Sequence, residues 1–326
     1  MQLADRHGRV ATDLRVSLTD RCNLRCQYCM PAEGLDWMPD EQTLTDDEVI
    51  RLISIGVERL GIREVRFTGG EPLLRRGLPR IIAATHALGV PTALTTNGLG
   101  LEHIADALAA AGLDRINVSL DTVDPVTFAA ITRRDRLADV QAGLQAAAAA
   151  GIGPVKINAV LLRDVNDVQA GDLLDWCMGH GYQLRFIEQM PLDAQHGWHR
   201  GDMVTADEII TRLEKEFRLT PLDGRGSSPA EHFLVDDGPH VVGIIGSVTR
   251  PFCGDCDRVR LTADGQVRNC LFAREESDLR SALRAGASDR ELAERWVMAM
   301  ASKLPGHGID DPAFLQPTRP MSAIGG

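Results

Sequence analysis

The chain has 326 residues, of which 44% are hydrophobic and 25% charged, as is ordinary for a soluble globular protein. Its formal net charge of −11 at pH 7 excludes nucleic-acid binding by the surface as a whole, so no nucleic-acid partner is expected. An anionic ligand would need a local basic pocket built mainly from arginine, because the only lysines are Lys156, Lys215 and Lys303.

No targeting or membrane segment is expected. Charged residues interrupt residues 1–20, which therefore lack the apolar core of a signal peptide, and no run of about 18 apolar residues occurs. The chain has 7 cysteines, an odd number that disfavours the disulfide framework of a secreted protein. We therefore expect a reducing, cytoplasmic location.

The first two thirds of the chain alternate strands and helices. Residues 45–60 illustrate the helical pattern, since Val49, Leu52, Ile53 and Val57 recur at helical spacing after an acidic first turn. Strands are predicted over residues 14–19, 65–68, 92–96, 115–120, 155–162 and 183–187. Helices are predicted over residues 45–60, 78–88, 101–111, 137–150 and 168–180. Such alternation implies parallel strands joined by right-handed crossovers.

These strand–helix units predict an α/β fold, a partial (β/α)6 TIM-like barrel, with an open doubly wound sheet as the alternative. In both folds, ligands bind at the C-terminal ends of the strands. Polar residues stand at these ends in this chain, at residues 68–71, 95–97, Ser119, Asp121 and residues 188–190.

After about residue 220 the pattern changes. Residues 223–229 are typical of a flexible connection, and Asp264-Gly265 is a hairpin turn signal. Short strands are predicted over residues 232–235, 241–245, 258–262 and 267–270, followed by a helix over 288–303 and a Pro- and Gly-rich tail over 310–326. The sequence therefore predicts two domains, residues 1–222 and a smaller C-terminal α+β domain of residues 223–326.

Six of the cysteines form two triplets, Cys22, Cys26 and Cys29, and Cys253, Cys256 and Cys270. Three thiolates can hold an iron–sulfur cluster and leave one of its irons open for a small ligand. Polar residues between the first three cysteines argue against a shared buried helix face as the alternative. For the second triplet, a zinc site is the alternative, with His232, His240 or His307 as the fourth ligand. Cys177 is expected to be a core thiol.

Basic residues lie on two of the predicted strands. Arg258 and Arg260 are two residues apart and share one strand face, opposite Val259. Two guanidinium groups on one face suit a triphosphate, although a solvated strand face is the commoner role of such a pair. Lys156 and Asn158 share a face in the same way, and a buried lysine needs an anionic partner.

Two motifs resemble those of known families. The C-x3-C-x2-C spacing of the first triplet, with Gly69-Gly70-Glu71-Pro72 after the second strand, resembles the radical S-adenosylmethionine superfamily. The string over residues 252–265, the later Cys270 and the terminal Gly-Gly resemble the GTP 3′,8-cyclase family of molybdenum cofactor biosynthesis. This resemblance covers the whole chain. Asp257 departs from it, because the family more commonly has Asn at that position.

The resemblance implies two [4Fe-4S] clusters, one on each cysteine triplet, and S-adenosyl-L-methionine as a cofactor. It assigns to the S-adenosylmethionine site Tyr28, Gly70, Ser119 and Met190. It assigns to the GTP site Arg15, Arg66, Thr95, Lys156, Arg258, Val259 and Arg260. It also implies that Gly325 and Gly326 reach into the active site and are needed for activity, since glycine passes where a side chain would clash.

The family converts GTP into (8S)-3′,8-cyclo-7,8-dihydroguanosine 5′-triphosphate, a lyase reaction that begins molybdenum cofactor synthesis. A 5′-deoxyadenosyl radical removes the ribose 3′ hydrogen, and the carbon radical attacks C8 of a guanine held at the second cluster. The resemblance implies a one-electron donor and a downstream cyclic pyranopterin monophosphate synthase as partners, and a monomer or homodimer. The alternatives are another radical enzyme with an auxiliary cluster, such as a peptide-modifying maturase, and a non-enzymatic iron–sulfur or zinc redox protein.

Overall fold

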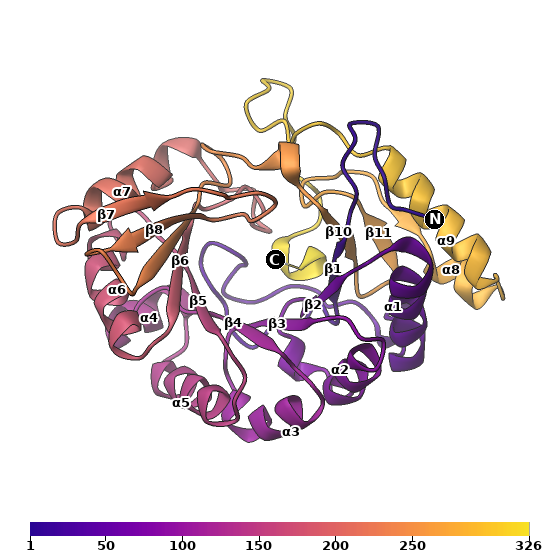
Figure 1. Ribbon diagram of the computed structural model, residues 1–326, viewed down its shortest axis with the longest axis horizontal. Coiled ribbons are helices and arrows are strands. Elements are labelled where there is room, and N and C mark those ends of the chain that lie inside the picture. Colours follow the sequence, from indigo (N-terminus) through magenta and orange to yellow (C-terminus); the bar gives the residue numbers. More distant parts are fainter. Residues whose placement is uncertain (326) are drawn as a thin grey trace.

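The computed structural model describes residues 1–325, whose strands join in one sheet (Figure 1). The strands are β1 (Asp13–Ser17), β2 (Glu64–Thr68), β3 (Thr92–Thr96), β4 (Arg115–Ser119), β5 (Val155–Val160), β6 (Gln183–Ile187), β7 (Leu219–Leu222), β8 (Glu231–Val235), β9 (Val241–Ile245), β10 (Arg258–Leu261), β11 (Gln266–Arg268) and β12 (Ser277–Asp278). The α-helices are α1 (Asp46–Leu60), α2 (Leu78–His86), α3 (Ala105–Ala110), α4 (Pro125–Thr132), α5 (Leu137–Ala149), α6 (Ala170–Gly179), α7 (Ala206–Leu213), α8 (Arg280–Arg284), α9 (Asp289–Ala301) and α10 (Met321–Ile324). Short 3-10 helices are η1 (Asp40–Gln42), η2 (Pro72–Leu74), η3 (Leu101–His103), η4 (Asp167–Gln169), η5 (Arg200–Asp202) and η6 (Cys253–Asp255).

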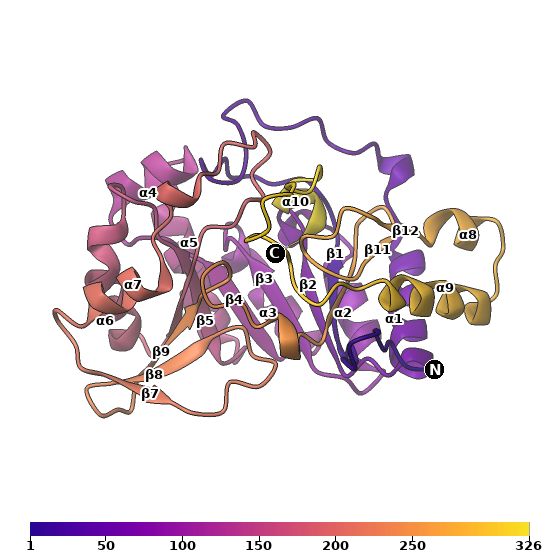
Figure 2. The ribbon, with the colours of Figure 1, turned by 90° about the horizontal axis from the view of Figure 1, so that it is seen from above.

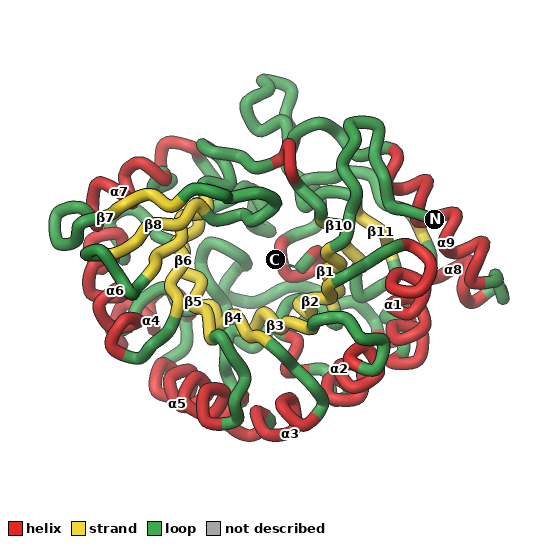
Figure 3. The backbone as a smooth tube through the Cα atoms, viewed as in Figure 1, coloured by secondary structure: helices red, strands yellow, loops and turns green. Residues whose placement is uncertain are grey.

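The strands form an open barrel. The sheet order is β12-β11-β10-β1-β2-β3-β4-β5-β6-β9-β8-β7, and its pairs are parallel from β10 through β1 to β6 and on to β9. The strands curve into a ring with helices around its outside (Figures 1 and 3). The order of β1 to β6 follows the chain without the reversal of a doubly wound sheet, so the predicted partial barrel is confirmed.

The predicted strands and helices of the first two thirds occur within a few residues of their expected ends. The predicted helix over 101–111 is divided into η3 and α3 at Ile104, and the helix over 168–180 begins with the 3-10 turn η4. Helices α4 and α7 were not predicted, although both have start signals. Asp124 caps α4 with Pro125 at its first turn, and Thr205 and Glu208 form a capping box on α7.

Strands from the C-terminal third join both edges of the barrel. β9 and the antiparallel β8 and β7 extend the sheet beyond β6, whereas β10 and the antiparallel β11 and β12 extend it beyond β1. Figure 2 shows the β7–β9 strands and the α8–α9 segment at opposite ends of the molecule. The residues after 222 therefore do not form a sheet of their own, and the division of the chain at 222/223 stays a prediction.

Alternation along the strands separates an apolar outer face from a polar inner face. Leu14 and Val16 of β1 are buried in the hydrophobic core against the surrounding helices, as are Val259 and Leu261 of β10. The residues between them point to the opposite face, into the ring. Functional side chains are therefore gathered inside the barrel. Within residues 1–325, no helix combines the length and apolar character needed to cross a bilayer.

Candidate active site

The first cysteine triplet lies in the loop that follows β1, at the C-terminal end of the barrel. The N–H groups of Cys29 and Met30 donate to the Cys26 carbonyl at 2.9 and 3.0 Å, which forms a tight turn between the second and third thiols. The end of α4 holds the same loop from outside, since Arg25 N donates to the Thr132 carbonyl at 3.0 Å. The three thiols are thus presented together at one rim of the ring.

The electrostatics of this loop suit metal-bound thiolates. Burial raises the pKa of Cys22 and Cys26, and it raises the pKa of Cys29 to about 12. Without metal these thiols therefore stay protonated, whereas a bound iron ion would supply the compensating charge. Neutral donors already point at the sulfurs: Asn97 Nδ2 lies 3.7 Å from Cys22 Sγ, and the Ser322 N–H hydrogen-bonds Cys29. These residues fit a group held by three thiolates.

No three His, Cys, Asp or Glu side chains of residues 1–325 converge closely enough to bind a single metal ion.

Gly70 lies where the loop after β2 meets the cysteine loop. Its N–H donates to the Thr19 carbonyl at 2.7 Å, and Glu71 N donates to the Arg21 carbonyl at 2.7 Å. A Cβ on Gly70 would stand 2.7 Å from the Arg21 carbonyl carbon and closer still to the carbonyl oxygens of Asp20 and Arg21. Only glycine allows this backbone-to-backbone contact.

Glu71 connects the first three strand ends. Its fully buried carboxylate accepts from Leu73 N at 2.9 Å, from Thr96 Oγ1 at 2.7 Å and from Asn97 N at 2.7 Å. Asn97 in turn donates toward the Cys22 sulfur. Burial raises the pKa of Glu71 to about 7. The carboxylate thus ties the glycine loop, the end of β3 and the first triplet into one unit.

Tyr28 has a structural partner at the end of β4. Its hydroxyl donates to Asp121 Oδ2 at 2.9 Å, and Asp121 Oδ1 accepts from Val160 N at 2.8 Å. Burial raises the pKa of Tyr28 well above its ordinary value and that of Asp121 to about 6. The Tyr28 side chain is therefore fixed within the cysteine loop, where the family resemblance predicts a contact with the cofactor.

A second feature of the interior is a set of cations on neighbouring strands, which we call the basic layer. It consists of Arg15 on β1, Arg66 on β2, Arg115 on β4, Lys156 on β5, Arg185 on β6, and Arg258 and Arg260 on β10. Strand register brings them together, since Arg15 is paired with Arg66 on one side and Arg260 on the other.

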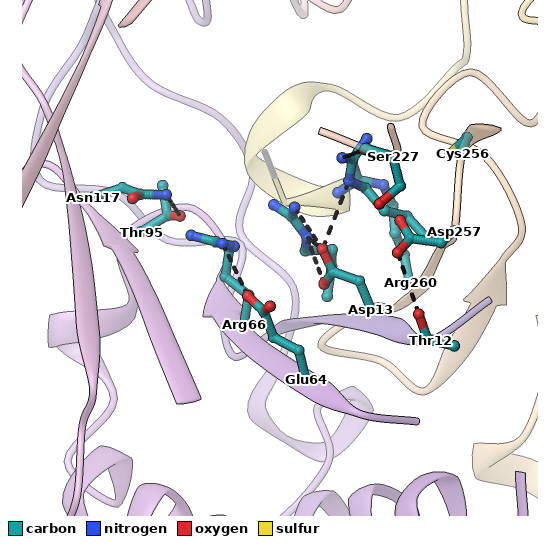
Figure 4. Close-up of polar contacts among 12 residues, drawn as sticks. Thr12, Asp13, Glu64, Arg66, Thr95, Asn117, Ser227, Cys256, Asp257 and Arg260 are labelled. Carbon is teal, nitrogen blue, oxygen red and sulfur yellow. Dashed lines mark hydrogen bonds and ion pairs between the residues drawn. The ribbon is translucent and has the colours of Figure 1, made fainter. Parts of the chain in front are cut away.

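Few carboxylates balance the basic layer. Asp13 lies 2.9 Å from Arg15, and Glu64 lies 3.1 Å from Arg66 (Figure 4). Glu64 also lies 2.7 Å from Arg115. Burial, reinforced by neighbouring arginines, lowers the pKa of Lys156 to about 8. The same causes lower the pKa values of the arginines listed next: Arg66, Arg185, Arg258 and Arg260. Such a surplus of buried positive charge is stabilised by a bound anion.

Several polar atoms in the basic layer and at the neighbouring Asn158 are free to bind a ligand. Lys156 and Arg185 form no ion pair with any carboxylate of residues 1–325, and Arg66 Nε and Asn158 Oδ1 are buried without a hydrogen-bond partner. Gly243, opposite Arg185 on β9, makes room for the arginine, because a Cβ there would stand 3.0 Å from Arg185 Cγ. These groups point to an anion-binding interior.

Arg115 and Arg185 were missed by the sequence analysis. Each stands on the inward face of a predicted strand, two residues from another polar position, so strand alternation carried the signal. The chain also places Thr95 beside Asn117, whose Nδ2 lies 3.5 Å from Thr95 Oγ1. Val259, by contrast, points into the hydrophobic core, so the structure does not bring its side chain to the basic layer.

The second cysteine triplet borders the basic layer. Cys253 is the first residue of η6, Cys256 follows η6 just before β10, and Cys270 follows β11. The three cysteines line one cavity together with Met190, Phe252, Arg258, Arg260, Phe272 and His307. Met190 was expected at the S-adenosylmethionine site, and it lies in the wall of this cavity. The antiparallel strands β10 and β11 thus connect the second triplet to Arg258 and Arg260 of the basic layer.

The thiols of this triplet differ in their electrostatics. Burial raises the pKa of Cys253. Burial would raise the pKa of Cys256 as well, but the Lys303 ammonium and the Arg258 guanidinium outweigh it and hold that pKa below its ordinary value. Cys177 lies apart from both triplets, fully buried in α6, and burial raises its pKa to about 12, so its expected core role is confirmed.

The C-terminal tail ends inside the ring (Figure 1). Ser17 Oγ donates to the Ile324 carbonyl at 2.7 Å, and Arg260 donates to the Gly325 carbonyl. Gly325 has φ 83°, and a Cβ there would stand 2.6 Å from Thr68 Cγ2. Glycine is therefore required at this position, while Gly326 lies outside the described residues. Ser119 is at the end of β4, on the inner side of the same rim.

An open barrel of parallel strands with a three-cysteine loop after β1 and a Gly-Gly-Glu-Pro loop after β2 defines a radical S-adenosylmethionine protein. A family model of the radical SAM superfamily matches residues 16–177, and a model described as Molybdenum Cofactor Synthesis C matches residues 182–309. A solved structure of Streptococcus suis SuiB has the same fold, with a TM-score of 0.61 and 13% identity over 93% of this chain and 68% of that chain.

Full-length relatives narrow the assignment. A GTP 3′,8-cyclase of Streptomyces coelicolor is 63% identical over 99% of this chain and 96% of its own length. One of Corynebacterium glutamicum is 61% identical over 99% of this chain and 89% of its own length. The chain belongs to the GTP 3′,8-cyclase family. Membership in the radical SAM superfamily implies one [4Fe-4S] cluster and S-adenosylmethionine, which the first triplet and Gly70 fit.

Proposed function

We propose that this protein converts GTP into (8S)-3′,8-cyclo-7,8-dihydroguanosine 5′-triphosphate, the lyase reaction that begins molybdenum cofactor synthesis. The observation that carries the proposal is the basic layer, which stands inside the barrel and borders the second cysteine triplet. A triphosphate suits such a surplus of guanidinium groups, because each guanidinium can form paired charge-assisted hydrogen bonds with phosphate oxygens. The identity of 63% to a GTP 3′,8-cyclase supports the same substrate.

The first triplet would hold the catalytic [4Fe-4S] cluster, and the loop at Gly70 would hold the methionine part of S-adenosylmethionine. Tyr28, Ser119 and Met190 are the further candidates for this cofactor. When bound and reduced, the cluster and its cofactor supply a 5′-deoxyadenosyl radical that removes the 3′ hydrogen of GTP. The chain's own part would be to fix the cofactor against the backbone of residues 69–71, which the close backbone contact of Gly70 with Asp20 and Arg21 holds in place.

The second triplet would hold a second [4Fe-4S] cluster whose open iron binds guanine. Support comes from the cavity that its three cysteines share with Arg258 and Arg260. The GTP ligands proposed from the sequence are Arg15, Arg66, Thr95, Lys156, Arg258, Val259 and Arg260, and Arg115 and Arg185 extend them. Val259 would contribute through its backbone, since its side chain is in the core. Gly325 and Gly326 would complete the active site from the tail.

The proposed activity implies partners that lie outside the chain. A one-electron donor must reduce the first cluster, and a cyclic pyranopterin monophosphate synthase would consume the product. A cytoplasmic location and a monomeric or homodimeric state accompany the proposal. So does a division of labour at about residue 222, with radical generation in residues 1–222 and guanine binding in residues 223–326.

One anaerobic experiment tests the function. The protein is reconstituted with iron and sulfide, its iron is counted, and S-adenosylmethionine, dithionite and GTP are added. We expect about 8 irons per chain, as two four-iron clusters require, and 5′-deoxyadenosine together with the cyclised nucleotide only when GTP is present. A count of about 4 irons per chain would contradict the presence of a second cluster. Deoxyadenosine yields that are the same with GTP, with ATP and without nucleotide would remove the substrate assignment.

Lys156 makes GTP binding dependent on pH. Because burial and the cations Arg185, Arg115 and Arg66 lower its pKa to about 8, the ammonium loses its charge as the pH rises above 8. Although burial lowers the pKa values of the neighbouring arginines, a guanidinium is not deprotonated in a folded protein, so these side chains stay charged over this range. His232, the other neighbour that titrates, has a lowered pKa and is neutral at pH 7 and above. The affinity for GTP should therefore fall about tenfold between pH 7.5 and 9.5, the effect of losing one charge-assisted contact.

Anaerobic titration calorimetry without S-adenosylmethionine measures this affinity directly. The variant Lys156→Arg keeps its charge at high pH, so its GTP affinity should change little over the same range. The variant Lys215→Arg, at an exposed position, serves as the control and should keep the wild-type profile. A wild-type profile that is flat to pH 9.5 would contradict the proposed role of Lys156.

A further inference from the structure

Lys303, just beyond the end of α9, is buried against the second cysteine triplet. Only 4% of the residue is exposed. Its ammonium donates to the Arg258 carbonyl at 2.9 Å, to the Cys256 carbonyl at 3.2 Å and toward Cys256 Sγ at 3.5 Å. These atoms account for its polar contacts within residues 1–325, and no carboxylate is among them.

A buried ammonium requires a nearby anion, because removing its hydration costs several kcal/mol that neutral dipoles do not fully offset. The two carbonyls around Lys303 supply partial charges alone. The Cys256 sulfur is the atom in contact with the ammonium that can carry a full negative charge. The ammonium is therefore placed to compensate the negative charge that Cys256 carries when it binds metal as a thiolate.

The chain holds the segment around Lys303 firmly against the triplet. Arg9, itself buried, donates to the Cys253 carbonyl at 2.6 Å and to the Leu304 carbonyl at 2.6 Å. Asn269, next to Cys270, donates to the Ala299 carbonyl at 2.8 Å. These hydrogen bonds connect the segments on both sides of Lys303 to both ends of the triplet. They therefore fix the position of the Lys303 ammonium relative to the cysteines.

The two triplets differ in the charge of the side chains that contact their sulfurs. The side chains hydrogen-bonded to sulfurs of the first triplet are neutral: the Asn97 amide lies 3.7 Å from Cys22 Sγ, and the Tyr28 hydroxyl is hydrogen-bonded to Cys26. The donor to the second triplet is a buried cation. Hydrogen bonds and positive charge near the sulfurs favour the more negative, reduced state of an iron–sulfur cluster and so raise its reduction potential.

We propose that Lys303 is a positioning residue for the second cluster: its ammonium holds the Cys256 thiolate in place and raises the reduction potential of the cluster bound there. The proposal rests on the proposed second cluster. It also predicts that the two clusters differ in potential, the second being the easier to reduce.

The test uses the full chain with Cys22, Cys26 and Cys29 all replaced by Ser, so that any remaining cluster belongs to the second triplet. In this background Lys303→Met removes the charge at similar length, Lys303→Arg keeps it, and Lys215→Met is the control at an exposed lysine. Iron content, the rate of iron loss to a chelator, and the midpoint potential from an EPR-monitored dithionite titration are measured under anaerobic conditions.

We expect about 4 irons per chain in the background protein. Lys303→Met should lose iron to the chelator about tenfold faster, the size typical of removing a group that orients a metal ligand. At a fixed potential its ratio of reduced to oxidised cluster should fall at least tenfold, a midpoint lower by 59 mV for one electron. The midpoint potential and the rate of iron loss of Lys303→Arg should lie near those of the background protein, and those of Lys215→Met should equal them.

The outcomes separate the two proposals. A background protein without iron overturns the second cluster itself. A background protein with about 4 irons whose potential and chelation rate are the same in Lys303→Met overturns the role of Lys303 while leaving the cluster. If Lys303→Met fails to fold, as judged by circular dichroism, Lys303→Gln gives the same comparison. Equal midpoint potentials for Lys303→Gln, Lys303→Arg and the background protein would then overturn the proposal.

Discussion

Gly70→Ala lowers the rate of 5′-deoxyadenosine formation about 100-fold or more. The added Cβ would stand 2.7 Å from the Arg21 carbonyl carbon, and still nearer to two carbonyl oxygens, where ordinary contact begins near 3.4 Å. The neighbouring atoms are backbone, so the glycine loop and the cysteine loop must move apart by nearly 1 Å. A displacement of this size at a reacting centre costs about 100-fold in rate.

The matched control is Gly179→Ala at the exposed end of α6, where nothing lies within 4 Å of the added Cβ. Its rate should equal that of the wild type. Deoxyadenosine is quantified by chromatography with saturating S-adenosylmethionine, and iron is counted in each protein. A Gly70→Ala protein with full iron and the wild-type rate would show that the close contact at Gly70 has no part in cofactor binding.

The repeated part of the fold could be predicted from local sequence. Each of β1 to β6 is a short apolar run that precedes a helical pattern, and this alternation alone specifies parallel strands in chain order. The partners of the outer strands could not be predicted in the same way. β10 pairs with β1 across more than two hundred residues, and nothing local to residues 258–261 indicates that partner.

The candidate site divides along similar lines. The cysteine triplets and the glycine loop are short motifs whose chemistry depends on spacing, so the sequence predicted them directly. Arg185 and Lys303 are single basic residues without a motif. Their importance comes from neighbours on other elements: Arg185 from Gly243 and the basic layer, Lys303 from Cys256.

The tail shows why composition can mislead. Residues 310–326 are rich in Pro and Gly, which favours an irregular chain end, yet the tail forms α10 inside the ring. Its carbonyl groups are captured by Ser17 and Arg260, and Arg319 pairs with Asp264 at 2.7 Å and with Glu276 at 2.9 Å. Contacts with distant residues therefore determine the position of the tail.

Arg260→Leu should lower kcat/KM for GTP about 100-fold. The guanidinium is buried on β10, lines the cavity of the second triplet, and has no carboxylate partner within residues 1–325, so a triphosphate is its natural counter-ion. A charge-assisted hydrogen bond contributes about 1.5–3 kcal/mol, and the upper part of this range corresponds to 100-fold. Loss of the contact with Gly325 adds to the effect by releasing the tail.

Two further variants separate these causes from general damage to the fold. Arg260→Lys keeps the charge without the paired geometry and should recover part of the lost activity, whereas Arg290→Leu, at an exposed pair with Glu294, should retain all of it. Cyclised product is measured at several GTP concentrations, with deoxyadenosine formation followed in parallel. Because Arg260 contacts the proposed GTP site and the tail but not the first triplet, iron bound by that triplet should stay unchanged. An Arg260→Leu enzyme with wild-type kcat/KM would contradict the assignment of the basic layer to GTP.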